Sequence, residues 1–195
     1  MPKYWSLIWP HDFLTGEKNL KTAVVYHSGY GHTQRIAQVV AEGAGAHLIA
    51  IDADGNITQA DWDILNAADA IIFGSPTYMG VVSWQFKKFA DATSKQWMSG
   101  AWKDKVAGGF TISSNLSGDK LSTIQYFMTL SMQLGMVWVG QTEANNGSLN
   151  RLGSSSGVMA QVGPTSPASD IPQGDLDTAK IYGQRVASIA AKLHV

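Results

Sequence analysis

The 195-residue chain contains no cysteine, which excludes disulfide bridges, a thiolate nucleophile and cysteine-ligated metals. It also lacks an excess of either charge, because 14 basic and 15 acidic residues leave a formal net charge of −1. This balance offers neither the basic surface of a nucleic-acid-binding protein nor the polybasic patch of a membrane-binding one, and it favours a small-molecule partner. Nothing in the composition indicates secretion, so we expect a cytoplasmic protein.

Long apolar runs are absent as well. A short apolar patch lies near the start, but Pro10, His11 and Asp12 interrupt it well before the length of a signal sequence or a membrane-spanning helix. We interpret residues 1–20 as an extension outside the core and residues 21–195 as one domain. A chain of this length can bury about 70% of its unfolded surface, so it needs no cross-links to fold.

Two further patterns are missing. The five histidines are scattered, without an i, i+4 pair or a neighbouring carboxylate cluster, so we expect no metal site. The G-x-G-x-x-G fingerprint and the lysine of a P-loop are also absent, which disfavours dinucleotide and nucleoside-triphosphate binding.

What the sequence does contain is an alternation of short apolar runs with amphipathic stretches. The runs predict strands at residues 22–27, 47–51, 69–73, 106–112 and 136–139. The stretches predict helices at residues 34–43, 60–67, 84–93, 120–134 and 175–193. We therefore predict an α/β fold, a three-layer sandwich around a five-stranded parallel sheet. Residues 145–174, rich in Gly, Ser and Asn, are predicted to be a structureless connection that serves as a lid or a subunit contact.

Parallel sheets of this kind bind ligands at the carboxyl ends of their strands, where the sequence places three suitable loops. The first, residues 28–34, precedes a helix whose free N–H groups and dipole favour an anion such as phosphate. Gly29 and Gly31 permit close backbone approach, and Ser28 and Thr33 add hydroxyl groups. The alternative is a plain glycine turn in which Thr33 is the helix N-cap.

The second and third loops offer polar groups and flat surfaces. In residues 74–80, backbone N–H groups beside Tyr78 and Met79 suit the polar edge and flat face of a ring system such as a flavin. Residues 113–118 supply small polar side chains. Taken alone, the second and third loops are more typical of ordinary turns, but three such loops on one sheet edge favour a ligand site.

The loops resemble those of the WrbA family of FMN-dependent NAD(P)H:quinone oxidoreductases, in the flavodoxin-like superfamily. The family's Ser-x-Tyr-Gly-His loop is matched by Ser28, Tyr30, Gly31 and His32. Its Pro-Thr-x-x-Gly loop is matched by Pro76, Thr77 and Gly80. Residues 69–77 and the sequence QWMSGA around Trp97 follow the family too, and the resemblance extends from about Lys21 to the C-terminus.

The resemblance implies a flavodoxin-like fold that binds FMN. The first loop would hold the phosphate, the second the isoalloxazine edge and the third the pyrimidine or ribityl side, with Trp97 bordering the ring and facing the substrate. The predicted cofactor-binding residues are Ser28, Tyr30, Gly31, His32, Thr33, Gln34, Pro76, Thr77, Tyr78, Met79, Gly80, Ser113, Ser114, Asn115, Ser117 and Gly118. NAD(P)H is the implied electron donor, a quinone or similar small molecule the acceptor, and a dimer or tetramer of identical chains the implied assembly.

The chain departs from the family at three places, which keeps alternative functions open. Gln133 and Leu134 stand where the family commonly carries a His pair, Tyr78–Val81 replaces its Arg-Phe-Gly-Asn, and the connection between residues 51 and 69 is shorter. The leading hypothesis is an NAD(P)H:quinone oxidoreductase, in which no acid–base side chain is required because the flavin carries the chemistry. The alternatives are a flavodoxin-type electron carrier and a degenerate flavodoxin-fold interaction protein that binds no flavin.

Overall fold

A computed structural model describes residues 20–193, so the predicted N-terminal extension lies outside the described residues except for Leu20. The central sheet is parallel, and its strand order is β2-β1-β3-β5-β6. These strands are β1 (Thr22–Tyr26), β2 (His47–Ala50), β3 (Ala70–Tyr78), β5 (Val106–Ser113) and β6 (Val137–Trp138). The predicted α/β fold with five parallel strands is confirmed, and two short strands are added to it, β4 (Val81–Val82) and β7 (Val158–Gln161).

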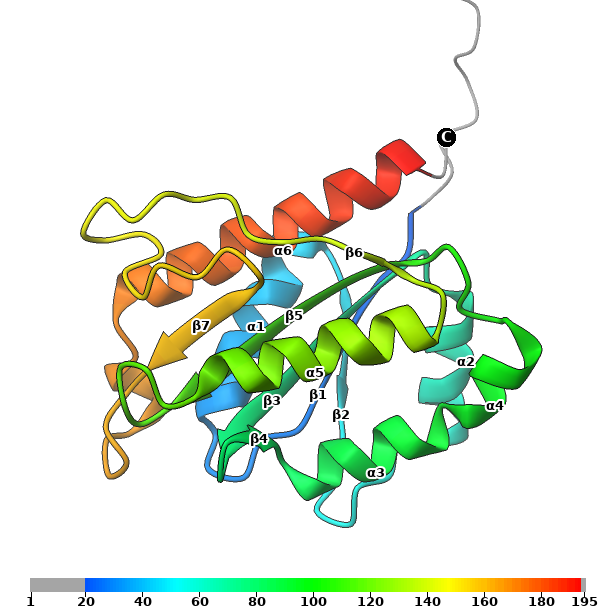
Figure 1. Cartoon of the computed structure of the whole chain (residues 1–195), viewed down its shortest axis with the longest axis horizontal. Coiled ribbons are helices and arrows are strands. Elements are labelled where there is room, and N and C mark those ends of the chain that lie inside the picture. Colours follow the sequence, from blue (N-terminus) through cyan, green and yellow to red (C-terminus); the bar gives the residue numbers. More distant parts are fainter. Residues whose placement is uncertain (1–19, 194–195) are drawn as a thin grey trace, which may run out of the picture.

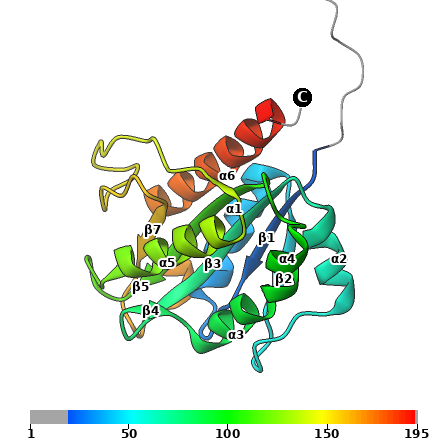
Figure 2. The ribbon, with the colours of Figure 1, turned by 45° about the vertical axis from the view of Figure 1, so that its right-hand side comes forward.

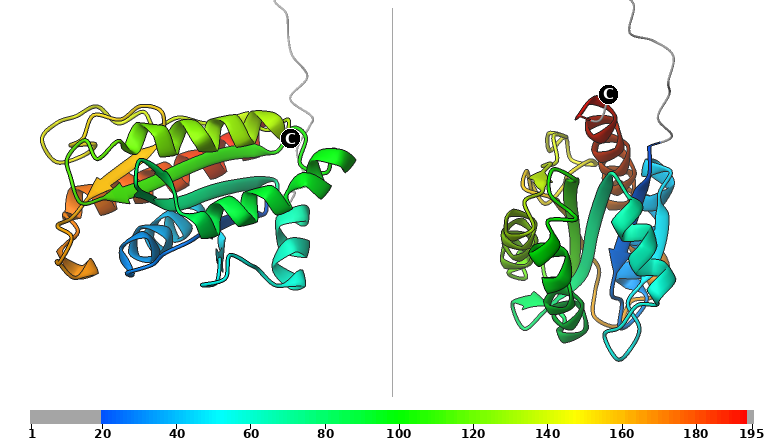
Figure 3. Two further views of the ribbon diagram at one scale, coloured as in Figure 1. Left: turned by 60° about the horizontal axis from the view of Figure 1, so that its bottom comes forward. Right: turned by 90° about the vertical axis from the view of Figure 1, so that its right-hand side faces the viewer.

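Helices cover both faces of the sheet, giving the predicted three layers (Figures 1 and 3). One face is covered by α1 (His32–Ala44) and α6 (Gln173–Leu193), which also pack against each other (Figure 2). The other face is covered by α2 (Gln59–Ala67), α3 (Trp84–Ala92) and α5 (Lys120–Gln133). The short helix α4 (Ser94–Ser99), which was not predicted, follows α3, and a 3-10 turn, η1 (Ala168–Asp170), precedes α6. None of the helices within residues 20–193 is long and apolar enough to cross a membrane.

The strands are buried on both faces, as their near-continuous apolar sequences require. Val24 and Ile72 point into the core beneath α1 and α6, whereas Val25, Ile71 and Phe73 point into the core beneath α3 and α5. All five side chains are fully buried. This alternation fixes the register of β1 against β3, because a shift of one residue would exchange the side chains of the two cores.

The strand β3 continues further than its sequence predicted. We expected it to end at Phe73 and residues 74–80 to form a loop, but Gly74 to Tyr78 remain extended, and Pro76 still pairs with Ile112 of β5. A Cβ atom at Gly74 would lie 2.2 Å from the ring of Phe110, so only glycine lets this ring lie against the strand. The loop therefore shrinks to the turn at Met79 and Gly80 before β4.

The fifth position of the sheet is divided between two segments. β6 pairs with the first half of β5, at Val106 and Ala107, and β7 pairs with the second half, from Phe110 to Ser113. The prediction of a structureless connection over residues 145–174 is therefore wrong, because it contains β7 and η1. Since β7 runs parallel to β5, its carboxyl end reaches the same edge of the sheet as the three predicted loops.

Candidate cofactor-binding cleft

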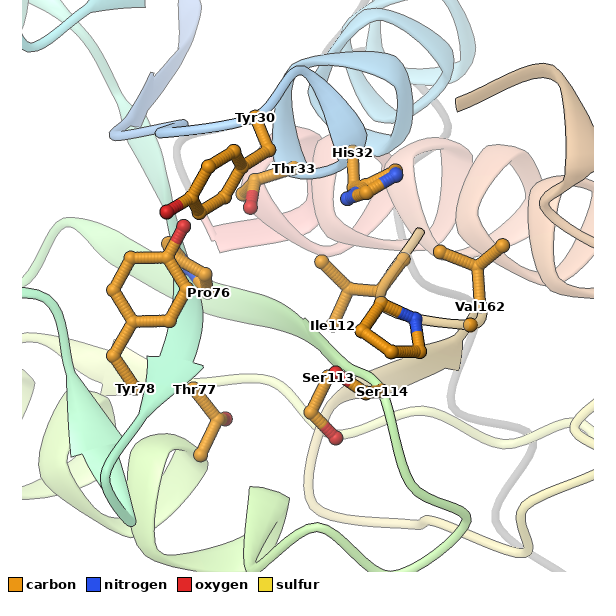
Figure 4. A pocket seen from close by; sticks show the side chains of 12 residues that line it. Tyr30, His32, Thr33, Pro76, Thr77, Tyr78, Ile112, Ser113, Ser114 and Val162 are labelled. Atoms are coloured by element: carbon orange, nitrogen blue, oxygen red, sulfur yellow. The ribbon is translucent and has the colours of Figure 1, made fainter. Parts of the chain in front are cut away.

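A cleft of about 270 Å³ opens where the carboxyl ends of β1, β3, β5 and β7 meet (Figure 4). The three predicted loops line it with Tyr30, His32, Thr33, Pro76, Thr77, Tyr78, Ser113 and Ser114. The sequence analysis missed the remaining lining residues, which are Ile112, Val162, Gly163 and Pro164. Val162, Gly163 and Pro164 follow β7. The only feature of the sequence that pointed to them was the length of the 145–174 connection.

The first loop presents the start of α1 to the cleft. Gly31 is the N-cap with a left-handed backbone (φ +86°), and its N–H donates to Ser28 Oγ at 3.1 Å. Thr33 is buried inside the first turn, so the alternative of Thr33 as the N-cap is wrong. The first N–H groups of an α-helix have no acceptor within the helix, and they favour an anion together with the dipole. Within residues 20–193, no lysine or arginine lines the cleft, so the expected anion contacts there are neutral donors.

His32 joins the first loop to the segment that follows β7. Its Nε2 donates to the carbonyl oxygen of Ser166 at 2.7 Å, across 134 residues of sequence. This bond holds the segment containing Val162, Gly163 and Pro164 beside the start of α1. The imidazole predicted to bind the cofactor therefore also fixes one wall of the cleft.

Two tyrosines form another wall. The rings of Tyr30 and Tyr78 meet edge to face, with centroids 6.2 Å apart, and their hydroxyl ends point toward each other in Figure 4. A Cβ atom at Gly29 would lie 2.7 Å from the Tyr78 hydroxyl oxygen, so a larger residue there would displace the end of the Tyr78 side chain. Burial, and to a smaller extent Tyr30, raises the pKa of Tyr78. The phenol stays neutral, and the wall offers a flat ring face and hydroxyl groups.

Buried hydroxyl groups hold the floor of the cleft. Thr77 Oγ1 lies 2.8 Å from Thr111 Oγ1 and 2.8 Å from Thr123 Oγ1, which links β3 to β5 and α5. Ser75 Oγ accepts from the N–H of Ser83 at 2.9 Å and thereby fixes the turn that leads into α3. Both features tie the end of β3 to its neighbours, so the residues that line the cleft are set on a rigid support.

The other predicted residues lie near the cleft or away from it. Ser28, Gly31, Gln34, Met79, Gly80, Asn115, Ser117 and Gly118 belong to the same loops without lining the cleft. Trp97 is 60% exposed on α4, at the opposite end of the sheet beside α2 (Figure 1). There Gln96 donates to Asn66 at 3.4 Å. The structure therefore does not bring Trp97 to the cleft of its own chain. Within residues 20–193, no group of three or more His, Asp or Glu side chains is arranged to hold a metal ion.

A doubly wound parallel sheet, with a helix N-terminus, a pair of aromatic rings and hydroxyl-bearing loops at its carboxyl edge, defines a flavodoxin-like protein. Residues 28–149 match the family of NADPH-dependent FMN reductases. The chain is 51% identical to flavodoxin FldP of Pseudomonas aeruginosa, over 89% of this chain and 98% of the relative. It is 35% identical to an NAD(P)H dehydrogenase (quinone) of Geobacter sulfurreducens, over 90% of this chain and all of the relative.

A solved structure leads to the same class. The flavodoxin, WrbA-like protein from Agrobacterium tumefaciens is 54% identical and superposes with a TM-score of 0.75, over 89% of this chain and 98% of that one. The chain belongs to the FMN-binding, flavodoxin-like family of NADPH-dependent FMN reductases that includes the WrbA proteins.

Proposed function

We propose that the protein binds FMN in the cleft and passes electrons from NAD(P)H to a quinone or a similar small-molecule acceptor. The observation that carries this proposal is the convergence of four strand ends, two of which bring aromatic rings and one a helix N-terminus, on one cleft. These are the groups that a phosphate and a flat, hydrogen-bonding ring system require.

Different residues in and around the cleft would bind different parts of FMN. The N–H groups at the start of α1 would hold the phosphate, and Ser28, which does not line the cleft, would fix their turn through Gly31. Tyr30 and Tyr78 would border the ring, and Ser113 and Ser114 would contact its polar side. The chemistry supplied by bound FMN would be hydride transfer from NAD(P)H, with a proton from water, followed by two-electron, two-proton reduction of a quinone to the quinol. The protein's contribution is to bind, orient and limit access, so no acid–base side chain is assigned.

Absorption spectroscopy of the purified protein, before and after addition of FMN, tests the cofactor. We expect the spectrum of a bound flavin and steady NAD(P)H oxidation when a quinone is supplied. A colourless protein that takes up no FMN would support the degenerate interaction protein instead. A flavin-loaded protein without turnover would eliminate the reductase activity while leaving the cofactor assignment intact.

A flavodoxin-type electron carrier is the second candidate, because the relative with 51% identity is named a flavodoxin. The formal net charge of −1 is weaker than such carriers use to dock on their partners. Reduction of the bound flavin by a flavodoxin reductase, with a rate that falls steeply with ionic strength, would favour the carrier. The cytoplasmic location and the homo-oligomer expected from the sequence stay predictions.

A further inference from the structure

A buried lysine lies directly beneath the third loop. Lys120 is the first residue of α5, and the residue is only 1% exposed. Its ammonium group donates three hydrogen bonds, to Ser113 Oγ at 2.9 Å, to the Asn115 carbonyl at 2.6 Å and to the Leu116 carbonyl at 2.9 Å. All three donors of the side chain are thus spent on one loop.

The loop is held by its carbonyl groups, which leaves its N–H groups free. Gln161 Nε2 donates to the Ser114 carbonyl at 2.8 Å, and the backbone N–H of Lys120 donates to the Ser117 carbonyl at 3.2 Å. Within the described part of the chain, the N–H groups of residues 115–118 have no acceptor. Consecutive free N–H groups in a loop are typical of sites that hold an anion or a negatively polarised oxygen.

The position of this charge is unfavourable for folding alone. A cation at the first turn of a helix opposes the helix dipole, and burial of an ammonium group is costly. Burial lowers the pKa of Lys120 to about 8; Asp175 offsets part of this shift by raising the pKa, and Arg151 lowers it further. The group therefore remains largely charged at neutral pH. Ser113 accepts a hydrogen bond from the ammonium group and also lines the cleft. The positive charge therefore lies directly behind a residue of the cleft wall.

We propose that Lys120 is a positioning residue that shapes the third loop for FMN and uses its charge to favour the more negative, reduced state of the cofactor. The proposal rests on FMN binding as proposed above. A fixed positive charge close to a site stabilises the redox state of its ligand that carries more negative charge, and it does so without touching the reacting atoms.

The test compares Lys120→Met and Lys120→Gln with a matched control, Lys105→Met. Lys105 is also a buried lysine, 9% exposed, whose ammonium donates to the carbonyl groups of Asn66 and Ala68, but it precedes β5 at the amino edge of the sheet. For each variant, FMN affinity is measured by fluorescence titration of the apoprotein, the midpoint potential by spectroelectrochemistry and the thermal midpoint by circular dichroism.

We expect Lys120→Met to lose at least tenfold more affinity for reduced than for oxidised FMN, which lowers the two-electron midpoint potential by about 30 mV or more. Lys120→Gln keeps hydrogen-bond donors without the charge, so it should bind oxidised FMN nearly as the parent does and still show the lower potential. Lys105→Met should lower the thermal midpoint without shifting the potential.

The outcomes separate the two proposals. If the parent protein binds no FMN, the proposed function fails. If the parent binds FMN and both Lys120 variants keep its potential, the inference about Lys120 is overturned, and the lysine is a structural clamp only. Should Lys120→Met fail to fold, Lys120→Gln decides between these results by the same potential measurement.

Discussion

Replacement of Thr77 by valine removes the central member of the buried hydroxyl cluster beneath the cleft. Thr77 Oγ1 is the hydrogen-bond partner of both Thr111 and Thr123, at 2.8 Å each, and neither of these hydroxyl groups has a second partner among the described residues. All three side chains are buried. Valine has nearly the same shape, so Thr77→Val deletes the hydrogen bonds and leaves the packing in place.

The expected loss follows from the two hydroxyl groups that become unpaired. A buried polar group without a partner costs about 1–3 kcal/mol, so the loss of two partners should lower the free energy of unfolding by about 2–6 kcal/mol. For a domain of this size, 1 kcal/mol shifts the thermal midpoint by about 2–4 °C, which makes a decrease of about 4–8 °C the minimum expected. The triple change to valine at residues 77, 111 and 123 should recover most of this loss, because no unpaired hydroxyl remains.

Thr22→Val is the matched control. Thr22 is equally buried in the sheet, but its Oγ1 has no hydrogen-bond partner within the described residues. The same chemical change should therefore leave the stability unchanged or raise it by up to about 1 kcal/mol. Both variants are measured by urea and thermal unfolding of the apoprotein. If they shift the thermal midpoint in the same direction and by similar amounts, hydrogen bonding does not hold the floor of the cleft.

Three shorter predictions concern Gly31, His27 and Asp175. Gly31→Ala should cost about 1–2 kcal/mol in urea unfolding, because the left-handed backbone at this position disfavours alanine. A steric clash does not contribute, since the added Cβ meets no atom within 4 Å. Burial lowers the pKa of His27, so the unfolded chain binds more protons below pH ~6.5 and stability should fall there. This fall should be smaller in His27→Gln. Asp175→Asn should cost about 3 kcal/mol, because it leaves the Arg151 guanidinium, 2.8 Å away, without its buried carboxylate partner.

The parts of the fold that the sequence predicts are those whose local pattern and burial agree. The run at residues 69–73 is apolar at four of its five positions, and the structure buries its strand on both faces. β7 was missed because its four residues lie between polar, Gly- and Ser-rich segments and gain their pairing from β5, about fifty residues earlier. The extension of β3 was missed because Gly74 and Pro76 usually end strands, and only the ring of Phe110 explains the glycine.

The candidate site, too, could be predicted from the sequence only in part. The order of strands and loops was sufficient to predict that residues 28–34, 74–80 and 113–118 meet at one edge. The edge-to-face pair of Tyr30 and Tyr78 could not be predicted, since it depends on how two loops far apart in the sequence approach each other. Lys120 was read only as the start of a helix, because its burial arises from the loop that folds back over it.

Because β6 and β7 share the fifth position of the sheet, the cleft is supported by residues that the sequence analysis placed in a connecting segment. Gln161, the last residue of β7, supports the third loop through the Ser114 carbonyl, and its own backbone N–H donates to the Asp175 carboxylate at 3.0 Å. Arg151, from the chain between β6 and β7, donates to the same carboxylate and to the Gln161 carbonyl at 3.0 Å. Asp175 and Arg151 do not line the cleft, but they hold Gln161 in place, and Gln161 in turn supports the third loop. Asp175→Asn should therefore weaken FMN binding as well as stability, whereas an equally destabilising change at the amino edge, such as Lys105→Met, should lower stability alone.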